Sequence, residues 1–146
     1  MSKQPTSQEA WELIKELTID KESATFLHLR GVGDTAGKIA EALREKGVEV
    51  DSDKARAFGY LHDIGRLIGP GQDHIINGYH YLKDHDFAEE YCAISLTHSF
   101  PNHTVDCILS TPIDPMREKL VHDYLPTHQF SLEEELVCLS DLMVHT

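Results

Sequence analysis

The sequence predicts an all-α fold: a compact bundle of about six to seven helices that forms a single domain over residues 1–146. Three observations lead to this prediction. Apolar residues recur at spacings of three and four along most of the chain, as on the buried face of a helix. Glycines and prolines divide the chain into segments of helical length, and the strand candidates are few and short. With 40% hydrophobic and 26% charged residues, the chain has the composition of a globular domain.

Start and stop signals define the predicted helices. Ser7 is placed to cap the first, a helical extension within about the first 20 residues that carries Trp11 and Ile14 on one face. Gly47 ends the second helix, and Ser131 with Glu134 forms a capping box for the last. In order, we expect helices over residues 7–17, 22–46, 52–64, 73–83, 87–98 and 117–124 and from residue 132 onward, with turns or loops at 69–71 and 101–115.

Charge, hydropathy and cysteine content exclude several classes of function. A formal net charge of −12 argues against binding to a long nucleic acid, whose affinity depends on basic side chains that face the phosphates. The apolar stretches are far shorter than the ~20 residues that span a bilayer, and the start of the chain is polar, so we expect a cytoplasmic protein with no membrane partner. Three widely spaced cysteines predict free thiols rather than a disulfide framework. Ten histidines direct the search to metal ligands.

A glycine-rich segment offers a competing interpretation. Gly31, Gly33 and Ala36 form a G-x-G-x-x-A pattern, and candidate strands flank it at residues 24–29 and 48–50. In a dinucleotide-binding unit such glycines let the backbone approach a pyrophosphate. However, no further strand–helix units follow, so a parallel sheet would have almost no strands. The all-α prediction instead requires close packing around the glycines, because each costs a helix up to ~1 kcal/mol relative to alanine.

The adjacent pair His62-Asp63 carries the strongest chemical signal. On a helix the two side chains point about 100° apart, so both cannot face the core, and an ionised aspartate beside an apolar face needs a partner. A divalent cation satisfies both, since an imidazole nitrogen and a carboxylate oxygen together suit transition metals rather than calcium. A second such pair, His122-Asp123, is expected to lie on the surface.

The surroundings of His62-Asp63 resemble a known family. The segment from Leu61 to Arg66 resembles the signature of the HD-domain superfamily of metal-dependent phosphohydrolases (HDIG type). Further segments resemble the other ligand-bearing helices of that family, in the order H…HD…H…H…D: residues 28–30, 73–82, 93–99 and 139–143. The resemblance covers residues 22–144 and implies a helical bundle with the metal site at its centre.

The resemblance also implies a set of ligands. The ligands of a first ion would be His28, His62, Asp63 and Asp141. Those of a second, optional ion would be Asp63, as a bridge, with His74 and His98. The cofactor would then be one or two divalent transition-metal ions, with Fe, Mn, Zn, Ni and Co as the candidates. The implied catalytic residues are Asp63 and Arg66, and Arg66 would pair with a phosphate oxygen of the substrate.

Other histidines and nearby polar residues are predicted to lie outside the ligand set. His80 points about 120° away from His74 on the same helix and is expected to lie on the surface, although it would replace His74 if the alignment of that helix shifted. His103 is a candidate pocket-lining residue. The candidate substrate contacts, by proximity alone, are Thr97, Ser99 and Asn102. The histidines expected to face solvent are His85, His122, His128 and His145.

The activity implied by the resemblance is hydrolysis of a phosphate ester, with a nucleotide or another small phosphorylated metabolite as substrate. Two alternatives share the same ligand order: a mixed-valent diiron oxygenase, and a non-catalytic regulatory domain that binds a metal or nucleotide. A homodimer is left open. The chain ends shortly after Asp141, where the last helix of such domains usually continues, so we expect either a truncated C-terminus or a minimal version of the domain.

Overall fold

Helices make up the regular structure of residues 1–69, 73–101, 103 and 115–144, the part of the chain that the computed structural model describes (for residues 115–118, the backbone only). The elements are α1 (Ser7–Leu17), α2 (Ala24–Glu45), α3 (Ser52–Leu61), α4 (Gly65–Ile68), α5 (His74–Asp84), α6 (Glu89–Thr97), α7 (Pro115–Tyr124), the 3-10 helix η2 (Leu125–Thr127) and α8 (Leu132–Met143). Within these ranges β pairing is limited to one isolated bridge, between Lys3 and Phe87. The all-α prediction is therefore confirmed.

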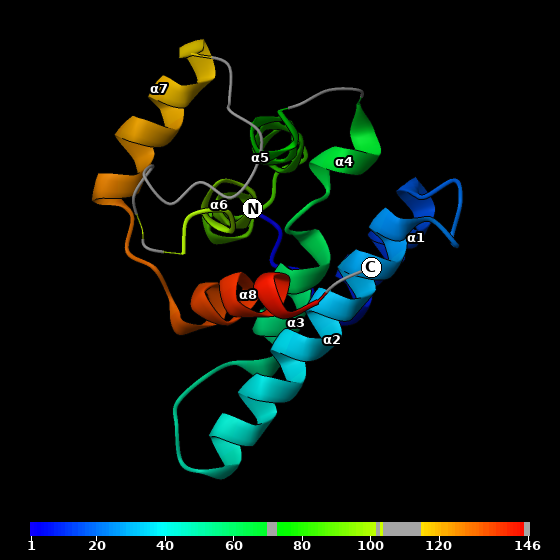
Figure 1. Ribbon diagram of the computed structural model, residues 1–146, viewed down its shortest axis with the longest axis vertical. Coiled ribbons are helices and arrows are strands. Elements are labelled where there is room, and N and C mark those ends of the chain that lie inside the picture. The colour runs from blue at the N-terminus through cyan, green and yellow to red at the C-terminus, as the bar shows by residue number, and fades with distance from the viewer. Residues whose placement is uncertain (70–72, 102, 104–114, 145–146) are drawn as a thin grey trace.

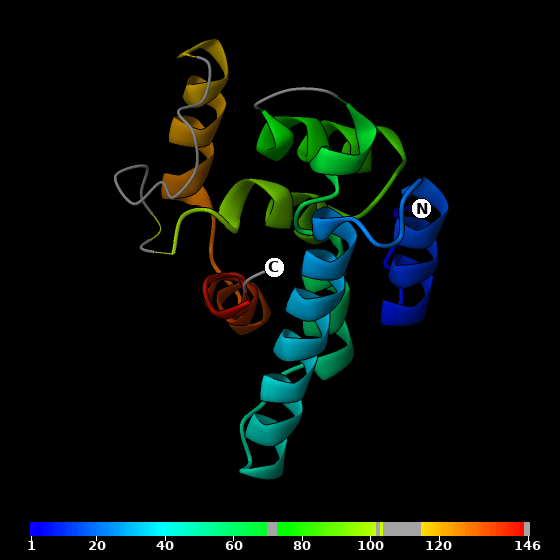
Figure 2. The same ribbon diagram turned by 45° about the vertical axis from the view of Figure 1, so that its right-hand side comes forward.

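The core lies where α2, α3 and α8 pack against one another (Figure 1). Among its buried side chains are Leu29, Val32, Phe58, Leu61 and Val137. α5 and α6 pack together beside this crossing, and α4 lies against α5. α1 packs on α3 at the edge of the molecule (Figure 2). None of the helices described above is both long and apolar enough to cross a membrane.

The predicted N-terminal caps of the first and last helices can be compared with the observed caps. The capping box of Ser131 and Glu134 is present at the start of α8, as predicted. At α1 the predicted cap, Ser7, is wrong by one residue. Thr6 is the N-cap, and its hydroxyl accepts the Glu9 N–H at 3.1 Å. Ser7 instead donates its hydroxyl and N–H to the carboxylate of Asp53, which fixes the start of α1 to the first turn of α3.

The predicted third helix is shorter than expected. It ends at Leu61, and residues 62–64 form a tight turn in which the Ile64 N–H donates to the Leu61 carbonyl at 3.1 Å. Gly65 then begins α4, and a Cβ at this position would overlap the His74 backbone. His62 and Asp63 thus lie at the break between α3 and α4, next to the close approach of α4 to α5.

The dinucleotide interpretation is wrong. α2 runs as a continuous helix through residues 24–45, and residues 48–50 have no regular structure. The close packing that the all-α prediction requires is present: a Cβ at Gly33 would overlap the Tyr60 ring, and a Cβ at Gly59 would lie 2.5 Å from the Gly33 Cα. These glycines let the axes of α2 and α3 approach closely.

Gly33→Ala is expected to destabilise the protein, although alanine favours a helix over glycine by up to ~1 kcal/mol. Because the added methyl group overlaps the Tyr60 ring, and overpacking costs roughly 1–3 kcal/mol, the expected net loss in unfolding free energy is up to about 2 kcal/mol. Gly31→Ala is the matched control, since its Cβ would meet only the end of the Val144 side chain. Equal unfolding free energies for both variants, measured with urea, would contradict this packing.

Candidate metal centre

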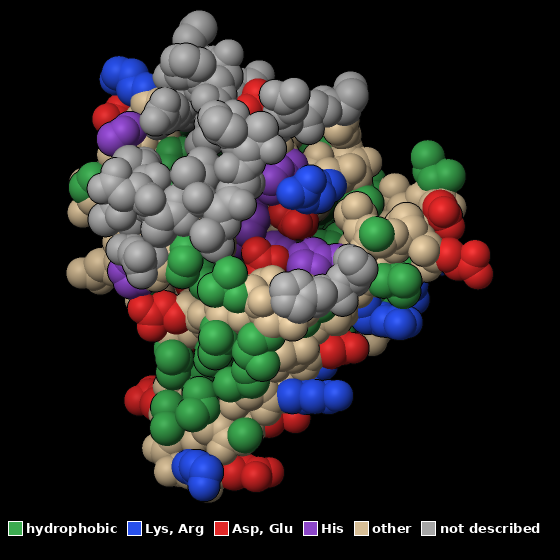
Figure 3. Space-filling model, in the orientation of Figure 1, with side chains coloured by type: hydrophobic (Ala, Val, Ile, Leu, Met, Phe, Trp, Pro, Cys, Tyr) green, Lys and Arg blue, Asp and Glu red, His purple; other side chains and the backbone are tan. Residues whose placement is uncertain are grey.

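The predicted ligands come from separate elements and meet at one point. In chain order they are His28 on α2, His62 at the end of α3, Asp63 in the following turn, His74 at the start of α5, His98 at the end of α6 and Asp141 on α8. His62, Asp63, His74 and His98 are buried, and the other two are partly buried. In Figure 3 histidine and acidic side chains gather in a hollow on this face of the molecule, with a basic side chain beside them.

One half of the cluster joins α2, α3 and α8. The Asp141 Oδ1 lies 2.7 Å from the His28 Nε2 and 3.3 Å from the His62 Nε2. Ligand atoms of these three residues all lie within 4.8 Å of one another. The Asp63 Oδ2 faces the same half, 3.5 Å from the His62 Nε2 and 3.9 Å from the His28 Nε2. A single cation with ligand bonds of about 2 Å fits such a spacing.

The other half of the cluster lies on the opposite oxygen of the same carboxylate. The Asp63 Oδ1 is 3.2 Å from the His74 Nε2 and 3.1 Å from the His98 Nε2. His62, Asp63 and His98 likewise have ligand atoms within 4.8 Å of one another. Thus one oxygen of Asp63 faces each half, which is the arrangement that a bridging carboxylate requires.

Backbone carbonyls orient two of the histidines. The His62 Nδ1 donates to the Gly59 carbonyl at 2.6 Å, and the His98 Nδ1 donates to the Ile94 carbonyl at 3.0 Å. In the neutral ring these bonds place the proton on Nδ1 and leave the lone pair of Nε2 pointing at the cluster. Second-shell bonds of this kind are usual for metal-binding histidines.

Two buried atoms at the centre lack hydrogen-bond partners. Among the described residues, the buried side-chain atoms without such a partner are the His62 Nε2 and the Asp63 Oδ1. The contacts of the Asp63 Oδ1 with His74 and His98 are close, but they lack the geometry of hydrogen bonds. Buried polar atoms are nearly always satisfied, so a common partner is implied. Imidazole nitrogens and carboxylate oxygens suit a divalent transition metal, and these residues therefore fit one.

The electrostatics keep both aspartates ionised. Burial by itself raises the pKa of Asp63, but its interactions with the neighbouring rings of His62, His98 and His74 outweigh burial and hold that pKa well below its ordinary value. The pKa of Asp141 is also lowered, because its contacts with His28 and His62 outweigh the effect of burial. Both side chains are therefore anionic ligands at neutral pH.

A comparison with known families settles the assignment. Residues 25–143 match the family model described as the HD domain. The chain belongs to the HD-domain family. This membership places it in a superfamily of metal-dependent hydrolases, whose members bind divalent metals. The helical extension that contains α1 precedes the matched region.

One relative of this HD-domain protein is an uncharacterised protein of Methanocaldococcus jannaschii. The two are 32% identical over 117 residues, which cover 80% of this chain and 64% of the relative. The chain thus spans less than two thirds of that relative's length. No solved structure matches the chain.

Arg66 lies at the rim of the cluster. Its side chain is 47% exposed, and its Nε donates to the Asp63 Oδ2 at 3.2 Å. One terminal nitrogen of the guanidinium group is 3.4 Å from the His74 Nε2. Arg66 therefore contacts the candidate ligands on one side and reaches solvent on the other, and its catalytic role stays a prediction.

The remaining histidines are mostly outside the cluster. His80, His85 and His122 are exposed, as the sequence predicts for all three. His103 stacks on Phe130, with ring centroids 3.7 Å apart, and is absent from the cluster. The solvent-facing prediction for His128 is wrong, because only 16% of its side chain is exposed. Two further predictions, for Asn102 and His145, lie outside the described residues.

The sequence predicts Glu134 only as part of a capping box, but its buried carboxylate also bonds to side chains of other elements. It is 3% exposed, and its carboxylate accepts from the Thr97 hydroxyl at 2.9 Å, the His128 Nε2 at 2.8 Å and the Ser131 N–H at 3.0 Å. These bonds tie the start of α8 to the end of α6, directly before His98. The Thr97 hydroxyl is consequently buried against Glu134 and does not face a substrate.

Glu134→Ala is expected to lower the unfolding free energy by about 3 kcal/mol, because it leaves the buried Thr97 hydroxyl and His128 without their partner. Glu135→Ala is the control in the same helical turn. It removes only an exposed ion pair with His103, and such pairs contribute about 0–1 kcal/mol. Similar urea midpoints for the two variants would show that the Glu134 bonds do not stabilise the fold.

Proposed function

We propose that this HD domain hydrolyses a phosphate ester of a small substrate, such as a nucleotide or another phosphorylated metabolite. The observation that carries the proposal is the position of two buried atoms, the His62 Nε2 and the Asp63 Oδ1. Both lack hydrogen-bond partners among the described residues, and both face the other candidate ligands. A site of this kind is built for a cation and would be costly to maintain without one.

The proposed ligands form two groups, one on each carboxylate oxygen of Asp63. His28, His62, Asp63 and Asp141 would hold one divalent transition-metal ion, and Asp63, His74 and His98 would hold a second. When bound, such ions lower the pKa of a water molecule and neutralise charge on a phosphoryl group. The candidates for the metal are Fe, Mn, Zn, Ni and Co.

The chain's own groups would place the substrate. Arg66 presents a half-exposed guanidinium group at the rim, beside Asp63 and His74, where it would bind an incoming phosphate through paired N–H donors. The formal net charge of −12 disfavours a long polyanion, whereas a small phosphate ester needs only this local cation and the metal centre. The proposed partner is therefore a small phosphorylated molecule rather than a nucleic acid.

A phosphate-release assay tests the proposal. Protein stripped of metal would be reconstituted separately with Mn, Fe, Zn, Ni or Co and incubated with nucleoside monophosphates, cyclic nucleotides and sugar phosphates. We expect phosphate or nucleotide products that appear with at least one metal and disappear with a chelator. Oxygen consumption by iron-loaded protein without hydrolysis would indicate the oxygenase alternative. Metal binding without either reaction would indicate a regulatory domain.

Arg66→Ala is expected to lower kcat/KM roughly 10- to 100-fold, mainly through a higher KM, because a charge-assisted contact with the substrate is lost. The bound metal should remain, since Arg66 is not among the proposed ligands. Arg44→Ala, at the exposed far end of α2, is the matched control and should behave as the wild type. An unchanged KM in Arg66→Ala would remove the substrate-binding role.

A further inference from the structure

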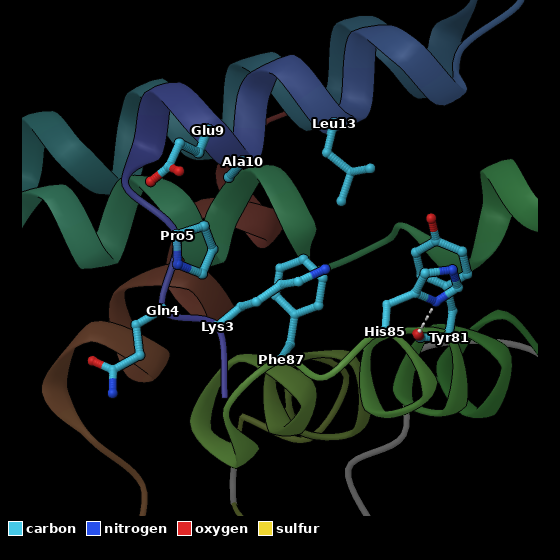
Figure 4. Close-up of a pocket in the computed structure, with 9 residues that line it drawn as sticks. All are labelled: Lys3, Gln4, Pro5, Glu9, Ala10, Leu13, Tyr81, His85 and Phe87. Atoms are coloured by element: carbon cyan, nitrogen blue, oxygen red, sulfur yellow. Dashed lines mark hydrogen bonds between the residues drawn. The ribbon is translucent and has the colours of Figure 1, made fainter. Parts of the chain in front are cut away.

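A second pocket lies away from the metal centre, between the N-terminal extension and the end of α5 (Figure 4). Its volume is about 340 Å³, which is at the lower end of the range for small-molecule sites. The side chains used below are Lys3, Glu9, Leu13, Tyr81, His85 and Phe87. The first three of these belong to the extension that precedes the matched HD-domain region. The pocket is therefore formed partly by residues outside the matched region and partly by residues within it.

The walls of the pocket suit a flat apolar group. Leu13 points into the space from α1, and the Phe87 ring lies across from it (Figure 4). At one end the rings of Tyr81 and His85 stack with centroids 4.0 Å apart. The His85 Nδ1 donates to the Tyr81 carbonyl at 2.7 Å, which holds the stacked pair in place. An aromatic ring between such walls gains dispersion contacts on both faces.

Lys3 supplies a positive charge at the pocket, on a residue whose backbone is held in place. Its N–H donates to the Asp86 carbonyl at 2.6 Å and its carbonyl accepts from the Ala88 N–H at 2.8 Å, so the backbone of this residue is held against the α5–α6 connection. The ammonium group lies 5.3 Å from the centre of the Phe87 ring. Within the described parts of the chain, no carboxylate forms an ion pair with it. The nearby acid, Glu9, uses its carboxylate to accept the Thr6 N–H in the cap of α1.

We propose that this pocket binds a small aromatic carboxylate. The ring would lie between Leu13 and Phe87, against the stacked Tyr81 and His85, and the carboxylate would pair with the Lys3 ammonium group. The pocket and the candidate metal centre share α5, since His74 begins the helix and Tyr81 lies in its last turn. They are separated by roughly 10 Å along its axis, at 1.5 Å per residue. The pocket thus has no lining residue in common with the candidate metal centre.

Binding of 2-naphthoate to chelator-treated protein tests the proposal, with neutral 2-naphthamide as the isosteric probe. Calorimetry is expected to show saturable binding of 2-naphthoate and about tenfold weaker binding of the amide. Lys3→Gln should weaken the binding of 2-naphthoate about tenfold and abolish its advantage over the amide. Leu13→Trp should abolish binding of both probes by filling the pocket, with circular dichroism to check that the variant folds.

Two controls locate the site. Lys15→Gln removes a lysine of α1 that is paired with Glu12, and this variant should bind 2-naphthoate as the wild type does. His62→Ala should also bind it normally, because the metal centre takes no part. The proposal is overturned if 2-naphthoate shows no saturable binding, if the amide binds equally well, or if Lys3→Gln leaves the affinity unchanged. Loss of binding in His62→Ala would likewise overturn it, by assigning the probe to the metal centre.

Discussion

Asp63→Asn is expected to lower kcat/KM for phosphate release at least about a thousandfold, a loss of ~4 kcal/mol of transition-state stabilisation. The two carboxylate oxygens of Asp63 face the two halves of the cluster, with its Oδ1 toward His74 and His98 and its Oδ2 toward His62. An amide has nearly the same shape but carries no negative charge, and its nitrogen cannot act as a ligand. Both halves of the proposed site would therefore lose an anionic ligand.

The chain supplies a matched control for this experiment. Asp123 also follows a histidine, but the pair His122-Asp123 is exposed, as predicted. Asp123→Asn should retain wild-type activity in the same steady-state assay, and circular dichroism should show that both variants remain helical. If Asp63→Asn kept more than about a tenth of the wild-type kcat/KM, Asp63 would not be essential to the reaction.

Metal addition is expected to raise the melting temperature by about 8–16 °C when the free metal is about a thousandfold above its dissociation constant. Under that condition a ligand specific to the native state stabilises it by ~4 kcal/mol, and 1 kcal/mol corresponds to roughly 2–4 °C for a chain of this size. The candidate ligands come from α2, the α3–α4 turn, α5, α6 and α8, so the site exists only when the chain is folded. Differential scanning calorimetry of chelator-treated and reconstituted protein measures the shift.

His62→Ala separates this site from adventitious metal binding. It removes a buried nitrogen that the described part of the chain leaves without a hydrogen-bond partner, and the shift in melting temperature should fall below about 3 °C. His122→Ala removes an exposed histidine and should preserve the full shift. Equal shifts in both variants would mean that the metal stabilises the protein from somewhere else.

Periodicity and capping signals in the sequence predict the helices, whereas the meeting of the ligand candidates is predicted only by the resemblance to a family. The spacing of apolar residues and the capping box at Ser131 locate α2, α5 and α8 closely, because these signals are local. The approach of His28, His62 and Asp141 depends on tertiary packing, which periodicity does not report. It could be anticipated only through the resemblance of the ligand order to a known family.

Other features follow from long-range contacts and could not be predicted. The break at residues 62–64 lies beside the close approach of α4 to α5 at Gly65, a contact between segments that apolar periodicity does not report. His128 has the sequence context of a surface residue, yet the buried carboxylate of Glu134 draws it inward. The pocket at Lys3 forms because residues 3–13 lie against residues 81–87, and local sequence signals do not report a contact between segments so far apart.

Metal content, measured by elemental mass spectrometry on protein purified without a histidine tag, tests the central claim most directly. Wild-type protein and Asp123→Asn are expected to hold about one or two transition-metal ions per chain, and Asp63→Asn and His62→Ala are expected to lose them. Two ions per chain would support both halves of the cluster, and one ion would support the half formed by His28, His62, Asp63 and Asp141. A wild-type protein that takes up no transition metal after reconstitution, or variants that keep the full content, would contradict a metal centre at His62 and Asp63.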